Sequence, residues 1–189
     1  YEDDSRDYKE FAVLHVDLRT RRRTARIAQV IHRTIPYPLL IVFASEKVRA
    51  LSTAHKRLSL AEKGAIVAED VIITDWIDLS HPTPVQRDFL SSLSIADLPH
   101  THFLAFYSAI VERLVALECS RLTGKYCLES KSDKQQARSE SLAACHELEG
   151  KIEELRAAIR KEAQFNRQVE LNSKLKQLES KLARKASEL

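Results

Sequence analysis

The 189-residue sequence lacks methionine, C-x-x-C pairs and any apolar run long enough to cross a bilayer, and no signal-peptide pattern opens it. Its three cysteines are odd in number, so a reducing cytoplasm fits the chain better than a disulfide framework. Because the initiator is absent and the chain starts with the acidic segment YEDDSRDY, we expect native N-terminal residues to be missing. These absences predict a cytoplasmic protein that does not enter a membrane.

A catalytic constellation is also absent. No G-x-S-x-G elbow marks a nucleophile, and His100 and His102 stand without the H-E-x-x-H or C-x-x-C spacing of zinc sites. We interpret both histidines as residues at the start of a helix. The sequence therefore predicts no catalytic residue, no metal site and no cofactor, and we expect a protein that is not an enzyme.

Asp17, Glu46 and Lys47 suggest one enzymatic alternative, a degenerate nuclease. Restriction-type nucleases hold a divalent metal with clustered carboxylates beside a lysine. Here the acids are expected at different edges of the sheet, and no E-x-K motif follows on a neighbouring strand. We favour the interpretation that Asp17 ends a strand and that Glu46 and Lys47 form a hairpin turn.

The first part of the chain shows the patterns of a small sheet with one helix. Short apolar runs bounded by charge predict strands at 11–18 and 39–45. Between them, isoleucines at helical spacing predict an amphipathic helix that ends at Ile35, before Pro36. Further strands are expected within 48–59 and 65–79. The order β-α-β-β-β predicts an α+β fold with a small, mostly antiparallel sheet.

Two more helices are expected before residue 128. Thr83 followed by Pro84 has the pattern of an N-cap and first helical residue, and that helix should run to about Leu93. The next helix is expected from about Thr101 to Gly124, a natural C-terminal glycine. We assign 1–128 to an α+β domain. The polar segment 129–140 is assigned to a linker, with a solvated helix start as the alternative.

Residues 141–189 carry two blocks of heptad spacing, which predict a long coiled-coil helix. The first block is Leu148, Ile152, Leu155 and Ile159, and the second is Leu171, Leu175, Leu178 and Leu182. The second block is displaced by two residues from the phase of the first, roughly 200° around a helix. Because no Gly or Pro lies between Lys151 and Leu189, a continuous helix is the simpler interpretation, and a fold-back near Phe165 and Asn166 is the alternative.

The junction between the two blocks is the segment RKEAQFNRQVELN at 160–172. We expect Phe165 to pack at the junction, with Asn166 and Asn172 setting the register. Both apolar stripes and the junction predict contact with a partner helix. The predicted partner-binding residues at the junction are Phe165, Asn166, Arg167, Val169 and Asn172.

The junction also carries a resemblance. It fits the pattern E-x-Q-F-N-R-x-V-E-L-N from Glu162 to Asn172, and I-P-Y-P-L-L-I-V-F and D-W-I-D-L occur at 35–43 and 75–79. In these motifs the chain resembles a bacterial family called domain of unknown function 4391. The resemblance implies a phage-defence or restriction-like setting, because such members are encoded beside helicase and DNA-methyltransferase genes. It also implies a further N-terminal helical segment.

The leading functional hypothesis is thus a non-enzymatic protein-interaction module, an accessory subunit of a bacterial DNA-targeting assembly. Its partner would be a helicase or DNA methyltransferase subunit, or a second copy of the chain. The alternative is direct nucleic-acid binding, because arginine forks match phosphate geometry. The candidate residues are Arg19, Arg21, Arg22, Arg23, Arg26 and Arg33. Against it stand a net charge of only +3 and the interpretation of these arginines as a solvated helix face paired with the acidic N-terminus.

Overall fold

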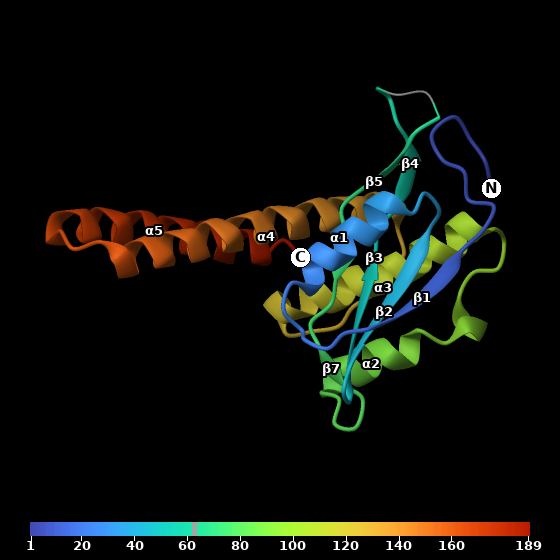
Figure 1. The fold of residues 1–189 in the computed structure, drawn as a ribbon, viewed down its shortest axis with the longest axis horizontal. Coiled ribbons are helices and arrows are strands. Elements are labelled where there is room, and N and C mark those ends of the chain that lie inside the picture. Colours follow the sequence, from blue (N-terminus) through green and yellow to red (C-terminus); the bar gives the residue numbers. More distant parts are fainter. Residues whose placement is uncertain (62–63) are drawn as a thin grey trace. The chain divides into compact units, whose positions relative to one another are not determined.

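The chain folds into two compact units. A computed structural model describes residues 1–61 and 64–189. Unit 1 comprises Tyr1–Ser120 and Gly124–Leu128, and unit 2 comprises Arg121–Thr123 and Glu129–Leu189. Figure 1 shows both. Unit 1 holds the sheet and unit 2 holds two long helices, so the α+β class predicted from the sequence is confirmed.

The main sheet of unit 1 has the strand order β1-β2-β3-β6, with β7 also pairing with β3. Its strands are β1 (Ala12–Asp17), β2 (Leu39–Ser45), β3 (Val48–Thr53), β6 (Ile72–Ile73) and β7 (Ile77–Asp78). β1 and β2 are parallel, and every other described pairing in this sheet is antiparallel. A parallel pair needs a crossover, which α1 (Thr24–Thr34) provides. The prediction of a small, mostly antiparallel sheet is therefore confirmed.

The two long strands expected after residue 48 are each interrupted. β4 (Lys56–Leu58) separates from β3 and pairs with β5 (Ile66–Ala68) in a second, two-stranded sheet. The break falls at Ala54 and His55. Ala54 N donates to the Tyr107 hydroxyl, and the Tyr8 hydroxyl lies beside His55 Nδ1. Side-chain hydrogen bonds thus replace part of the strand ladder at this point.

Helices cover both faces of the main sheet (Figure 1). On one face, Ile27 and Ile31 of α1 pack against Ile41 and Phe43 of β2. On the other face, α2 (Pro84–Ser92) and α3 (Phe103–Thr123) pack against side chains that include Leu51 of β3. Alternate residues of a strand face opposite sides of the sheet. The apolar residues of β2 therefore meet hydrophobic side chains on both faces.

The predicted ends of α1 and α3 and the predicted start of α2 are confirmed. The C-cap of α1 is Ile35, whose N–H donates to Ile31 O. Thr83 and Gln86 form a capping box at the start of α2. Gly124 caps α3 with a φ of 75°, a conformation that favours glycine.

Unit 2 corrects the prediction of one continuous C-terminal helix. α4 (Ser132–Lys161) and α5 (Phe165–Ala186) are separate helices that pack side by side, and Figure 1 shows them running in opposite directions. The fold-back alternative is therefore the right one. α4 also begins inside the segment 129–140, so most of that predicted linker is helical.

Candidate binding surfaces

The register of the helical pair follows from one ion pair. The Arg156 guanidinium of α4 donates to the Glu179 carboxylate of α5 at 3.0 Å. Three residues, Glu162 to Gln164, connect the helices. The turn is held by side chains: Gln168 Nε2 donates to Glu162 O at 2.6 Å, and Gln164 N donates to Glu162 Oε1 at 2.9 Å.

In this register the two heptad blocks lie opposite each other. Ile152 is buried, with 4% of its surface exposed, and the other seven leucines and isoleucines of the blocks are partly buried. The expectation that they form two exposed stripes is wrong. The displacement between the blocks is a consequence of the turn, since each helix presents its own apolar side to the other.

Phe165 does not pack at the junction. Its side chain is 75% exposed at the start of α5, and Asn166 and Asn172 are exposed as well. The Asn172 amide donates to Gln168 O at 2.7 Å, within its own helix. These three side chains therefore do not lie between α4 and α5, and their role in the register of a contact with a partner helix stays a prediction.

Phe165, Val169 and Asn172 nevertheless share a surface, which we call the outer stripe. Residues spaced by four and three lie on one side of a helix. Val169 is 53% exposed, and its position is about 200° around α5 from Leu171, which belongs to the packed block. The outer stripe therefore faces away from α4. Arg167 lies two residues from both Phe165 and Val169 and therefore on a different side of α5, with its guanidinium 3.9 Å from the Glu162 carboxylate.

The six candidate arginines are all exposed, and among the described residues none of them forms an ion pair. The predicted pairing with the acidic N-terminus is wrong, because those acids have local partners. Lys9 Nζ lies 2.9 Å from Glu2 and 3.0 Å from Asp7. The interpretation of the six arginines as one helix face is also wrong, because α1 starts only at Thr24 and Arg22 lies before it.

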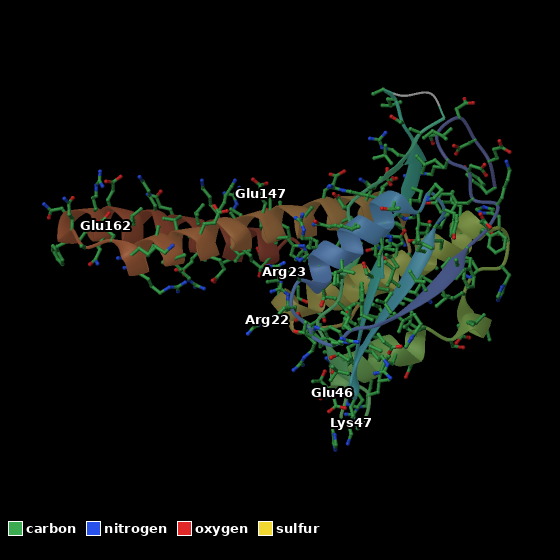
Figure 2. The ribbon with its side chains drawn as sticks, viewed as in Figure 1. Arg22, Arg23, Glu46, Lys47, Glu147 and Glu162 are labelled. Carbon is green, nitrogen blue, oxygen red and sulfur yellow. The ribbon has the colours of Figure 1, made fainter. Side chains whose placement is uncertain are left out.

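The hairpin interpretation of Glu46 and Lys47 is confirmed, because the two residues form the turn between β2 and β3. Asp17 ends β1, as predicted. The carboxylates do not lie at different edges, however. Since β1 and β2 are parallel with Asp17 beside Ala44, Asp17 and Glu46 follow neighbouring strands to the same end of the sheet. Arg22, Arg23, Glu46 and Lys47 are labelled in Figure 2.

His102 serves as the N-cap of α3, and its Nδ1 accepts a hydrogen bond from Ala105 N at 3.0 Å. This confirms its interpretation as a residue at a helix start. Within residues 1–61 and 64–189, no three His, Cys, Asp or Glu side chains are grouped so that they could hold a metal ion. Across the same residues, every helix is too short or too polar to cross a bilayer.

A buried polar network that sequence reasoning missed lies where β3 gives way to β4. The Tyr8 hydroxyl is 2.9 Å from His55 Nδ1 and accepts from Lys56 N at 2.9 Å. The Tyr107 hydroxyl donates to Ala54 O and accepts from Ala54 N. Arg6 Nη2 donates to both carboxylate oxygens of Glu69, at 2.9 and 3.1 Å. Burial lowers the pKa of His55 to about 4, and the Arg6 charge adds to the shift.

A second buried group joins α1 to the sheet. The Lys56 ammonium donates to His32 O and Ile35 O, the last carbonyls of α1. His32 Nε2 lies 3.1 Å from Ser52 Oγ. Burial lowers the pKa of His32 to about 4, with the Lys56 charge adding to the shift, and burial lowers the pKa of Lys56 to about 8. Because Lys56 is enclosed, we interpret it as a helix cap. Its direct neighbours His55 and Arg57 are polar as well, so the sequence carried no signal that Lys56 is the enclosed residue.

The comparison with family models gives one match. The model for the domain of unknown function DUF4391 matches residues 1–182. The chain belongs to this family. The match spans both units of this chain. No curated protein and no solved structure matches the chain.

Proposed function

We propose that this protein is a non-enzymatic interaction module that binds a protein partner through the outer stripe of α5. The observation that supports the proposal is the exposure of Phe165 at 75% and Val169 at 53%, one turn apart on a helix whose other side is occupied. Helices that dock into a groove of a partner use anchors at i, i+4 and i+7, which is the spacing of the outer stripe. Aromatic anchors contribute much of the binding free energy in such contacts.

The partner we propose is a helicase or DNA methyltransferase subunit of a bacterial DNA-targeting or phage-defence assembly in the cytoplasm. The sequence motifs that resemble DUF4391 members support this setting. A second copy of the chain is the competing partner. Binding to either partner would bury Phe165 and Val169 and would leave the packing of α4 on α5 unchanged.

The first prediction tests the outer stripe. We expect replacement of Phe165 and Val169 by serine to abolish capture of a helicase or methyltransferase from the source organism and any self-association. The change in unfolding free energy should be within about 0.5 kcal/mol, because exposed side chains contribute little to stability. Affinity purification with mass spectrometry, light scattering and denaturant unfolding are the measurements.

The matched control replaces Ile95 and Leu79 by serine, since these are also exposed apolar side chains, at 68% and 49%, but belong to unit 1. This variant should capture the same partner as the unchanged protein. Equal capture by both variants, or a chain that stays monomeric and captures neither enzyme class, would show the proposal to be wrong.

A further inference from the structure

The backbone of the loop at 18–23 is held by hydrogen bonds near both ends, and the loop carries four long basic side chains. At its start, Leu18 N donates to Ala44 O at 2.8 Å, and at its end Thr24 Oγ1 donates to Arg21 O at 2.7 Å. Arg22 N lies 3.4 Å from Thr20 Oγ1. The loop carries Arg19, Arg21, Arg22 and Arg23, all exposed and without ion pairs among the described residues. The guanidinium groups therefore project from a backbone that is held at both ends.

The first turn of α1 adds to this positive surface. It contains no acidic residue, and no side chain caps it. Unpaired N–H groups and the helix dipole give a helix N-terminus a partial positive charge, which acidic residues usually offset. Here Arg26 occupies the first turn instead. We call the five arginines 19, 21, 22, 23 and 26 the arginine end of unit 1.

The neighbouring hairpin turn contributes one more cation, Lys47, and one anion, Glu46, and the end of β1 contributes a second anion, Asp17. Because β1 and β2 are parallel, Lys47 lies beyond the same end of the sheet as the arginine end, and so do Asp17 and Glu46. Asp17 is 84% exposed and lies 3.6 Å from His15 Nδ1. Cations outnumber the carboxylates, but the carboxylates should weaken the attraction of any anion. Removing the charge of these two carboxylates should therefore tighten the binding of an anion.

We propose that the arginine end binds the phosphate backbone of duplex nucleic acid. Arginine forks bind phosphate oxygens in a bidentate geometry. No aromatic residue lies between Leu18 and Arg26, so the stacking that characterises single-strand binding is absent from the loop. Contacts of this kind position a protein on a duplex and carry no sequence information. The arginine end therefore binds duplexes of any sequence.

The test uses the full chain and a fluorescent DNA duplex of mixed sequence, titrated at several salt concentrations. Replacement of Arg22, Arg23 and Arg26 by alanine should weaken binding equally for unrelated sequences. The slope of log K against log salt should fall by about three, since each phosphate contact contributes about 0.9. The matched control replaces Lys161, Lys176 and Lys181 of the helical pair, which removes the same charge, and its slope should be unchanged.

A second variant moves the affinity the other way. Replacing Asp17 by asparagine and Glu46 by glutamine should tighten duplex binding severalfold, because two exposed carboxylates no longer repel the phosphates. If the variant with three alanines has a lowered melting temperature, a variant with Arg22→Gln and Arg26→Gln is used in its place. Its slope of log K against log salt should fall by about two.

Four results would overturn the proposal. The alanine triple could leave the slope unchanged, or the lysine triple could lower it equally. A single-stranded oligonucleotide of the same length could bind more tightly than the duplex. Anionic lipid vesicles of phosphatidylglycerol and phosphatidylcholine could bind while the duplex does not. The outer-stripe variant with Phe165 and Val169 replaced should bind the duplex normally, so this test is independent of the proposed protein partner.

Discussion

At the scale of single residues, burial determines the charge of His32 and His55. Both side chains are enclosed in unit 1, and both have a pKa lowered to about 4, first by burial and then by a neighbouring cation. Neutral imidazole is therefore the form that the folded protein holds at neutral pH. His32 Nδ1 also has no hydrogen-bond partner among the described residues, so a proton there would meet no acceptor.

The second prediction follows from these two histidines. In the unfolded chain a histidine titrates near pH 6.5, while in the folded protein these two titrate near 4. Between these values the unfolded chain binds the extra protons. Stability is therefore fully present above pH 6.5 and falls as the pH decreases toward 4, by up to about 3 kcal/mol for each histidine. Denaturant unfolding at several pH values measures this.

His32→Gln should flatten the decline, although it also lowers stability at pH 7 by disturbing the packing. His81→Gln is the control, because His81 is 87% exposed, and it should retain the full decline. A decline of the same steepness in the His32 variant would contradict the assignment.

Phe165 illustrates what a residue pattern leaves open. The sequence identifies it as unusual, because an aromatic interrupts a charged helix with leucine spacing. The direction of its side chain depends on where α5 starts, however. If one helix continued through the segment, Phe165 would lie between two apolar blocks. Because the chain turns at Glu162 to Gln164, Phe165 instead opens a new helix and faces solvent.

At the scale of elements, the helical pair is the main departure from the predictions. Helix ends usually carry Gly or Pro, and their absence after Lys151 favoured one helix. The turn is stabilised by the side chains of Glu162 and Gln168 instead. The two-residue displacement of the heptad blocks was the available signal. A turn explains it without requiring two different partner surfaces.

The third prediction measures the fold-back directly. Spin labels at positions 146 and 187 should lie within about 25 Å of each other, since packed helices have axes 8–10 Å apart. One continuous helix would separate them by roughly 60 Å at 1.5 Å per residue. Cys127, which is exposed, is replaced by serine so that it takes up no label.

Labels at positions 147 and 161, both on α4, provide the control. Their separation should be about 21 Å with or without the fold-back, because they share one helix. A long distance for the first pair together with the expected distance for the second would disprove the antiparallel arrangement.

At the scale of the whole molecule, Tyr107 connects three elements of unit 1. From α3 its hydroxyl accepts from Ala54 N at 3.0 Å, and its single proton lies between two acceptors, Leu39 O at 2.8 Å and Ala54 O at 2.9 Å. Burial raises the pKa of this phenol, so the hydroxyl keeps its proton. One side chain thus binds a main-chain group of β2 and the main-chain groups of Ala54, where the sheet is interrupted.

The fourth prediction is that Tyr107→Phe destabilises unit 1 by about 2–4 kcal/mol, because buried main-chain groups lose their partner at about 1–3 kcal/mol each. Thermal and denaturant unfolding measure the loss. Tyr1→Phe is the control, since Tyr1 is 44% exposed and should change stability by less than about 0.5 kcal/mol. A loss of similar size in both variants would contradict the role given to the Tyr107 hydroxyl.

The sequence was informative about elements and less so about how they pair. Proline after Ile35, the Thr83 cap and Gly124 each act within one turn of helix, so they predicted boundaries correctly. Periodicity predicted the helix between the first two strands, but it did not predict that β1 and β2 pair in parallel. The network around Tyr8 and Tyr107 joins residues distant in the chain, and no local pattern marks it.

The position of Tyr8 has a consequence for the order of events on the ribosome. Tyr8 is fully buried, yet its partners His55 and Lys56 and the neighbouring ring of Tyr107 are made much later. At about 5–20 residues per second, Tyr8 waits on the order of 5–20 s for the synthesis of Tyr107. The N-terminal segment is thus the first part of unit 1 to be synthesised and among the last to dock. Nascent chains halted before α3 would leave it open to proteases.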